Sequence, residues 1–581
     1  MTWYITDIAR FRSERQEIEV LAQAVDWFSV TAWRFDDRLR LVLDAEIEAG
    51  GRIYPIYLQY PDMFPHTPPS VFPRGDGSRW SSHQFGAGGE LCLEYGPDTW
   101  TPDLRGMDLI ESCHRLIRLE SPTEGERCLA PSRHAETLGQ QFRSRYSRFL
   151  LTGEFRALIE RLPLRIAMTA NLVSVYHKEA VVHVIDRVKL PDDASWTDQT
   201  VPTQLASEYM QREVAICRWP ASDAPPSTAS LDAFGSWFAA LGMPLEAKHA
   251  LVVHGTKLAV YFLDHEQNAV IEVGILAADP GGPRLDVDHA VLADKKVGLI
   301  GCGSLGSKVG CMLARSGVAQ FLLIDDDILL PANFVRNDLD WRDAGAHKVP
   351  ALARRLQMVN PAADVIQWRA RLAAQEANES AEAMLSRISQ CDLIIDATAD
   401  PNVLNLVSAV GAAAKKPILW AEVFGGGIGG LIARSRPGQE PSPSYMRRAI
   451  ENWFGERGEP PARPVRPYEA GPAGAAPLIA DDADVSVIAA HAARFAIDLL
   501  IDRMPSLFPN SVYAIGLGVG SVFSQPFETY PIDVGPPPAE TPLVELSKEE
   551  TATEFAALVA LLKDKLNGTA ASPPGRGPSK T

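Results

Sequence analysis

The stretch Lys296-Val-Gly-Leu-Ile-Gly-Cys-Gly-Ser-Leu-Gly306 decides how the second half of the chain is interpreted. Its apolar run Val297-Gly-Leu-Ile300 predicts a buried strand, and the six residues that follow lead into a helix. Gly301, Gly303 and Gly306 stand where backbone amides and a helix N-terminus can meet phosphate groups. The sequence therefore predicts a nucleotide-binding loop between a strand and a helix.

A second apolar strand, Phe321-Leu-Leu-Ile324, ends in Asp325-Asp-Asp327. An acidic residue roughly 20 positions after the glycine loop can bond a ribose hydroxyl. Further short strands alternate with helices, which is typical of a doubly wound parallel sheet. Up to this point a nicotinamide-dependent dehydrogenase would fit as well as an enzyme that uses ATP.

The residues that follow separate these two possibilities. Asn333 and Arg336 come after the aspartates, and Gly345-Ala-His-Lys348 comes next. This order and spacing resemble the adenylating-enzyme family that includes the ubiquitin activators and the activators of sulfur-carrier proteins. The resemblance covers about residues 290 to 535 and implies a ThiF-type domain that binds ATP. Asn333, Arg336 and Lys348 would then donate to phosphate oxygens while a carboxylate attacks the α-phosphate.

The acidic segment Asp396-Ala-Thr-Ala-Asp400 follows a third strand and resembles the motif that holds Mg²⁺ in the same family. This chain has one more residue between the two aspartates than that motif has. We expect Asp400 to be the metal ligand rather than Asp396, for which a cap at the strand end is the competing interpretation.

The first part of the chain has a different pattern. Apolar residues from Ile5 to Leu21 recur at helical spacing, and Leu41–Ile47 and Ile56–Tyr60 alternate with a period of two. A second helix is expected over about 103–119. These elements predict an α+β domain in which a meander follows a helix.

A candidate thiol site lies between this meander and the second helix. The Pro-rich segment Tyr60–Pro69, His83, Gly89-Glu-Leu-Cys92 and Trp100-Thr-Pro resemble the ubiquitin-conjugating family in order and approximate spacing. The resemblance implies that Cys92 carries an acyl group as a thioester, with Trp100 and His83 supporting the site. The His-Pro-Asn of that family reads His83-Gln84-Phe85 here, so Gln84 or backbone amides would have to stabilise the oxyanion.

Seven cysteines occur without a Cys-x-x-Cys pair, which argues against a zinc ribbon and against a disulfide framework. Cys113, Cys311 and Cys391 are expected in the core. Activators that form their own thioester carry a cysteine beyond the nucleotide core, but none follows Cys391. We therefore expect the adenylate to pass directly to Cys92, with a relay through Cys302 or another group as the alternative.

The length of 581 residues implies several domains. We expect a ubiquitin-conjugating-like domain over residues 1–160, a middle α/β linker domain without a chemical signature over 161–290, and the ThiF-type adenylation domain over 291–535. Residues 536–581 should form a helix, about Leu546 to Leu566, and a disordered tail. The Pro-, Gly-, Ala- and Arg-rich stretch 435–478 predicts a long loop.

The net charge of −17 and the pI near 5.3 argue against nucleic acid as a partner. The chain has neither an apolar run long enough to cross a bilayer nor a secretory pattern at Met1–Asp7, so a cytoplasmic protein without a membrane partner is expected.

The order of the two domains resembles bacterial fusions encoded in CBASS-type antiphage operons and in related ubiquitin-like operons. The resemblance implies an enzyme that needs ATP and Mg²⁺, forms a homodimer, and attaches the C-terminus of a ubiquitin-like protein or a cyclic-nucleotide synthase to a protein target. Two alternatives remain open, which are a docking scaffold with an inert conjugating-like domain and an adenylyltransferase for sulfur-carrier proteins.

Overall fold

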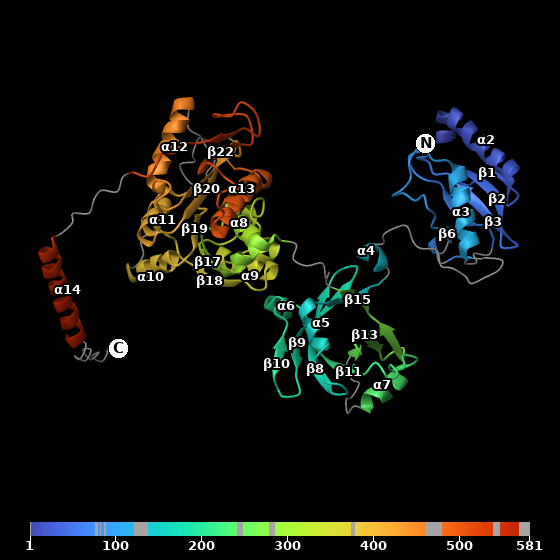
Figure 1. The fold of residues 1–581 in the computed structure, drawn as a ribbon, viewed down its shortest axis with the longest axis horizontal. Coiled ribbons are helices and arrows are strands. Elements are labelled where there is room, and N and C mark those ends of the chain that lie inside the picture. Colours follow the sequence, from blue (N-terminus) through green and yellow to red (C-terminus); the bar gives the residue numbers. More distant parts are fainter. Residues whose placement is uncertain are drawn as a thin grey trace. The chain divides into compact units, whose positions relative to one another are not determined.

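The computed structural model describes residues 2–75, 80–81, 83–85, 89–120, 137–143, 145–240, 248–277, 285–373, 378–458, 479–538 and 547–568. The chain forms two compact units, Met1–Ser144 and Arg145–Thr581, and the second unit contains two large sheets (Figure 1).

The first unit is a helix followed by an antiparallel four-stranded meander in the order β1-β2-β3-β4. Its core is formed where α2 and α3 pack on one face of the sheet, with Ile18, Leu43 and Ile110 fully buried. The expected helix and meander are therefore confirmed, and two strands, β1 and β4, are added to them. The elements are α1 (Trp3–Thr6), α2 (Ile8–Ala24), β1 (Phe28–Phe35), β2 (Leu41–Ala49), β3 (Arg52–Gln59), β4 (Ser70–Pro73), β5 (Gln84–Phe85), β6 (Glu90–Leu91), α3 (Gly106–Glu120) and α4 (Leu138–Gln141).

The second unit begins with a nine-stranded mixed sheet in the order β14-β13-β12-β11-β8-β9-β7-β15, with β10 beside β9. Strand β7 pairs with β9 and β15, so the residues from 147 onward belong to this sheet. The structure divides the chain after Ser144, earlier than the boundary expected at 160, because the apolar residues of β7 and α5 are buried in the second unit. The elements are β7 (Ser147–Leu151), α5 (Gly153–Ile159), β8 (Ala167–Tyr176), β9 (Val181–Lys189), β10 (Ser195–Thr197), α6 (Thr203–Glu208), β11 (Met210–Trp219), α7 (Leu231–Ala239), β12 (His249–His254), β13 (Lys257–Asp264), β14 (Ala269–Glu272) and β15 (Gly274–Ala277).

The other sheet is the doubly wound one that the sequence predicts. Five parallel strands in the order β18-β17-β16-β19-β20 continue into antiparallel β21-β22-β23. Helices α8, α9 and α13 bury their apolar faces against one side, and α10, α11 and α12 against the other. The elements are η1 (Val287–Asp294), β16 (Lys296–Ile300), α8 (Ser304–Arg315), β17 (Gln320–Ile324), η2 (Pro331–Asn333), η3 (Trp341–Asp343), α9 (Lys348–Val359), β18 (Asp364–Trp368), α10 (Asn378–Ser389), β19 (Leu393–Asp396), α11 (Pro401–Ala414), β20 (Ile418–Phe424), β21 (Gly429–Ser435), α12 (Pro443–Arg457), α13 (Asp482–Ile501), β22 (Val512–Gly516) and β23 (Thr529–Pro531).

The expected loop over 435–478 is wrong in its first half. Residues 443–457 form α12, because Met446, Ile450 and Phe454 recur every four residues and are all buried. Residues 459–478 and the expected tail, 569–581, lie outside the described residues. The expected C-terminal helix is confirmed as α14 (Lys548–Gly568).

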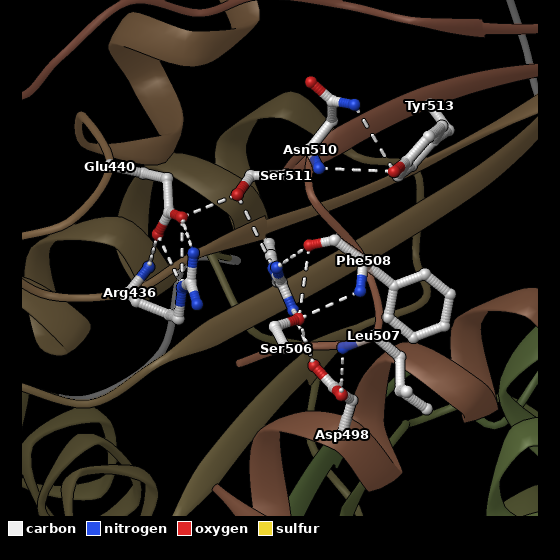
Figure 2. A network of polar contacts seen from close by, with 10 residues as sticks. Arg436, Glu440, Asp498, Ser506, Leu507, Phe508, Asn510, Ser511 and Tyr513 are labelled. Carbon is white, nitrogen blue, oxygen red and sulfur yellow. Dashed lines mark hydrogen bonds and ion pairs between the residues drawn. The ribbon is translucent and has the colours of Figure 1, made fainter. Parts of the chain in front are cut away.

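A buried polar network links the antiparallel strand β21 to helix α13 and to the segment before β22 (Figure 2). The Arg434 guanidinium on β21 donates to the Asp498 carboxylate on α13 at 2.9 Å and to the carbonyl of Phe508 at 2.7 Å. Asp498 also accepts from the Ser506 hydroxyl at 2.6 Å and from the Leu507 amide at 3.0 Å. Burial lowers the pKa of Arg434. Residue 435 pairs with the first residue of β20, so the network lies at the edge formed by the amino ends of the parallel strands.

Among the helices of the described ranges, none combines the length and the apolar character that crossing a membrane requires.

Candidate functional site

The carboxyl end of β16 is the point where the chain order in the sheet reverses. Ile300 pairs with Ile324 of β17 on one side and with Asp396 of β19 on the other. The loops that follow these three strands therefore emerge at one edge of the sheet. Open α/β sheets bind ligands at such a switch point, in the crevice beyond the strand ends.

The glycine loop is packed too tightly for side chains at two of its positions. Gly301 has a φ of +88°, and a Cβ there would meet the backbone of the β19 loop at 3.1 Å. A Cβ on Gly306 would lie 1.8 Å from the carbonyl oxygen of Gly301. A Cβ on Gly303 would meet nothing within 4 Å, and this residue directly precedes α8. The loop thus brings bare backbone to the N-terminus of a helix, as the sequence predicts.

Asp325 braces the glycine loop from the end of β17. Its carboxylate accepts from the Cys302 amide at 2.7 Å and from the Asp327 amide at 2.8 Å. A contact between this carboxylate and a ribose stays a prediction. The bond to the Cys302 amide links the loop after β17 to the loop after β16.

Lys348 and Asp327 form an ion pair beside the glycine loop. The Lys348 ammonium donates to the Asp327 carboxylate, and the Lys348 amide donates to the carbonyl of Asp327 at 2.9 Å. The lysine is 4% exposed, whereas the Asp327 side chain is 57% exposed. Partial burial acts to raise the pKa of Asp327, but Lys348 and the Ile328 amide lower it overall. A buried cation is therefore held at the edge where phosphates are expected, with its counter-ion toward solvent.

Asn333 and Arg336 lie in the segment between these two residues. The Asn333 side-chain oxygen accepts from the Leu330 amide at 2.9 Å, which closes the turn η2. Arg336 is half-buried one turn later, and its amide donates to the carbonyl of Asn333 at 3.1 Å. Their roles toward a phosphate remain predictions.

Two residues that sequence reasoning missed also fix this site. The Asn337 side-chain amide donates to the carbonyl of Cys302 at 3.3 Å, and its oxygen accepts from the Leu339 amide at 3.1 Å. Lys308 on α8 is 5% exposed and pairs with Asp482, in the first turn of α13, at 2.6 Å. Asn337 directly follows Arg336 in the sequence, and this position beside a predicted site residue is the sequence feature that points to Asn337.

The Asp396–Asp400 loop has one buried and one half-buried aspartate. Asp396 is buried at the end of β19, where it accepts from the Thr398 amide at 2.9 Å and the Thr398 hydroxyl at 2.6 Å. Burial raises the pKa of Asp396 to about 6, and the Asp400 and Glu422 carboxylates add to this effect. Asp400 caps α11 by accepting from the Asn402 amide at 2.9 Å.

The carboxylates near the strand ends determine how well Mg²⁺ would fit there. Within the described ranges no three His, Cys, Asp or Glu side chains gather closely enough to hold a metal ion by themselves. Mg²⁺ is commonly held by one or two carboxylates together with substrate phosphates and water. Asp400, beside the small cavity of about 40 Å³ that also borders Asp396 and Glu422, fits that partial role. The choice between Asp400 and Asp396 stays a prediction.

The expected thiol site lies in the first unit, where β5 and β6 form a short ribbon. The Cys92 amide donates to the carbonyl of His83 at 2.8 Å, so the ribbon holds these two residues side by side. Cys92 is half-buried, whereas the other described cysteines, Cys113, Cys217, Cys302, Cys311 and Cys391, are buried. The ribbon thus gives Cys92 a partly accessible position that the core cysteines lack.

Two side chains of the expected thiol site, Trp100 and Gln84, are held by hydrogen bonds to the backbone. The Trp100 indole donates to the carbonyl of Pro65 at 2.7 Å, which fastens the segment after the thiol to the Pro-rich loop. The Gln84 oxygen accepts from the amides of Trp80 at 2.6 Å and Ser81 at 3.1 Å, and its amide donates to the carbonyl of Gly89 at 3.0 Å. Gln84 is 5% exposed, so its amide braces the ribbon and is occupied there. This bonding disfavours Gln84 as the replacement for the missing asparagine.

The buried cysteines have raised thiol pKa values. Burial raises the pKa of Cys302 well above its ordinary value and raises that of Cys391 to about 11. A thiol must ionise to attack an acyl group, so these positions are poor relays. Cys128 lies outside the described residues.

Residues 285–447 match the model of the ThiF family. The chain is 31% identical over 182 residues to the uncharacterised protein y4oA of Sinorhizobium fredii, a match that covers 30% of each protein. It is 32% identical over 125 residues to the ATP-dependent ubiquitin transferase-like protein Cap2 of Escherichia coli, covering 21% of this chain and 20% of Cap2. These matches span less than a third of either relative. The solved structure of Escherichia coli MccB with ATP is 19% identical over 43% of this chain and 67% of that one, with a TM-score of 0.33. The residues that match the family model contain the three loops that follow β16, β17 and β19.

Proposed function

We propose that the doubly wound domain activates the C-terminal carboxylate of a partner protein by adenylation with ATP. The observation that carries this proposal is the meeting of the glycine loop, the buried Lys348 and the Asp396–Asp400 loop at one switch-point edge. The ThiF match covers the same residues. A dehydrogenase would leave the buried lysine at this edge without a purpose.

In this reaction a carboxylate oxygen of the partner attacks the α-phosphorus of ATP, and the bond to the pyrophosphate leaving group breaks. The products are an acyl-adenylate and pyrophosphate. Negative charge grows on the phosphate oxygens, so donors fixed beforehand accelerate the step. Lys348, Arg336 and the amides of the glycine loop would supply them. Mg²⁺, when bound, would neutralise phosphate charge near Asp400.

The acyl group is then captured on Cys92. Its thiolate attacks the acyl carbon, AMP leaves, and a thioester forms that stays reactive toward an amine of the protein target. The half-buried position of Cys92, against five buried cysteines among the described residues, supports this choice and favours direct transfer over a relay through Cys302. With Gln84 occupied, backbone amides would stabilise the oxyanion. The first unit, Met1–Ser144, would thus serve as a ubiquitin-conjugating-like domain fused to the activating domain.

The name of the Cap2 relative supports a ubiquitin-like protein as the activated partner, and a cyclic-nucleotide synthase ending in a free carboxylate belongs to the same proposal. The enzyme would act in the bacterial cytoplasm, as a homodimer, in antiviral defence.

Exchange of labelled pyrophosphate into ATP tests the adenylation step. The protein is incubated with Mg²⁺, ATP and small proteins encoded beside its gene. Exchange should depend on such a protein and fall at least about a hundredfold in Arg336→Ala, since removal of one electrostatic donor costs roughly that much. Arg342→Ala is the matched control, because this nearby arginine is 69% exposed and pairs with Asp340. Equal exchange in both variants would contradict the proposal.

Non-reducing gels test the second step. A thiol-sensitive adduct should form with the unaltered chain and with Cys302→Ala, but not with Cys92→Ala. A different outcome would support a second candidate, in which the conjugating-like domain only docks partners. The internal bonding of Gln84 favours this candidate, because the thiol then lacks a side-chain oxyanion donor at that position. An adenylate without an adduct on Cys92 would identify it.

A further inference from the structure

Helix α14 has an apolar stripe that no described residue covers. Phe555, Leu558, Val559 and Leu562 recur at steps of three and four, and Phe555, Leu558 and Leu562 are 65%, 51% and 52% exposed. None of the described side chains over 547–563 is buried. An isolated helix gains most of its stability by packing such a stripe against a partner surface.

The doubly wound domain has a groove of matching character between α10 and α11. Its cavity of about 700 Å³ is bordered mainly by small and apolar side chains. Small residues allow a third helix to approach closely, and larger ones on that helix fill the space. The groove residues are Ala381, Glu382, Leu385, Ser386, Ser389, Val410, Ala413 and Ala414.

The charges of the groove and of α14 are complementary. The strands β18, β19 and β20 are parallel, so the helices that connect them, α10 and α11, both run opposite to the strands and point the same way. Exposed Arg387 and Lys415 lie at their carboxyl ends, and exposed Glu382 near the amino end of α10. Helix α14 has Glu549 and Glu550 in its first turn. An antiparallel α14 would bring these carboxylates to the basic carboxyl ends of α10 and α11 and oppose the helix dipoles.

The chain connection allows this arrangement. Val534 is buried in the same core as α10, α11 and α12, and Trp453 of α12 packs on Tyr530 of β23 at 5.7 Å. The thirteen residues 535–547 can span at most roughly 43–47 Å. Packed helices lie about 8–10 Å apart, so the groove is about two helix spacings from α12. We propose that α14 docks antiparallel in the α10–α11 groove of its own chain.

Hydrogen exchange of the full-length chain tests the docking. Amides of α14 should exchange at least about tenfold more slowly in the unaltered chain than in Leu558→Glu, which corresponds to about 1.4 kcal/mol of docking. Leu561→Glu is the matched control, since Leu561 is 69% exposed and lies off the stripe. Ala413→Arg in the groove should release α14 as well, whereas Ala412→Arg, outside the groove lining, should not. Equal exchange in all five proteins would overturn the proposal.

A cross-link identifies the chain to which the groove belongs. Leu558→Cys combined with Ala413→Cys should form a disulfide within one chain, and Leu558→Cys with Ala412→Cys should not. A link that forms only between two chains would show that a second copy supplies α14, and would overturn docking within one chain. Neither measurement depends on ATP, so a failure here leaves the proposed adenylation untouched.

Discussion

Replacing Asp498 by Ala should destabilise the doubly wound domain by about 4 kcal/mol. The change leaves the Arg434 guanidinium, whose side chain is 1% exposed, without its counter-ion. Removing one member of a buried pair typically costs about 3–5 kcal/mol. Arg434 keeps its bonds to Ser506 and to the carbonyl of Phe508, which holds the cost within that range.

The measurement must be local because a chain of several domains does not unfold in one step. Native-state hydrogen exchange of peptides from β21 and β22 reports the free energy of opening of this domain. Glu451→Ala is the matched control, because its side chain is 53% exposed and its i,i+4 pair with Arg447 on α12 should contribute only about 0.3–0.5 kcal/mol. Asp498→Asn should lie between the two. If Asp498→Ala cost no more than Glu451→Ala, the network would not hold this edge. Pyrophosphate exchange per folded molecule should be unchanged, because the network lies opposite the nucleotide edge.

Three further outcomes are expected. Gly306→Ala should abolish the rise in unfolding temperature that ATP produces, because the new Cβ would overlap the glycine loop, whereas Gly303→Ala, which meets nothing within 4 Å, should retain at least part of it. The raised pKa of Asp396, about 6, means that its neutral form contributes stability fully present below about pH 4 and lost as the pH rises through 6. Asp396→Asn should remove this slope from the opening free energy of the domain, gaining about 3 kcal/mol at pH 7 relative to the parent. Iodoacetamide under native conditions should modify Cys92 within minutes and Cys302 only after unfolding, as peptide mass mapping can show; equal rates would contradict the burial difference.

The elements that the sequence predicts best are those with one clear period and one buried face. The strand Val297–Ile300 and the glycine turn after it are local features, and the structure confirms them. The prolines, glycines and arginines on both sides of α12 predict a loop. The helix forms because Met446, Ile450 and Phe454 make one apolar stripe that is buried. The structure divides the chain before the expected boundary near 160, because β7 pairs with β9 and β15, which begin 34 and 127 residues after Ser147.

For the candidate site, the sequence predicts residue types better than it predicts their hydrogen bonds. A short motif predicts that Asp325, Lys348 and the glycines lie near one another, and the structure brings them together, while their contacts with a nucleotide stay predictions. The bonding among them could not be predicted, because it depends on which loops meet. Gln84 illustrates this difference: the sequence presents it as a possible oxyanion donor, and only the fold of the ribbon reveals that three backbone groups already occupy its side chain.

The ion pair between Lys348 and Asp327 sets a condition on any anion that enters the nucleotide edge. An anion that binds Lys348 must displace the Asp327 carboxylate, so a phosphate without a cation gains little binding free energy. A ligand that binds together with a cation compensates for the lost ion pair, since the displaced Asp327 carboxylate can then pair with that cation. Asp327 therefore competes with an incoming anion for Lys348, which favours anions that arrive with a bound cation.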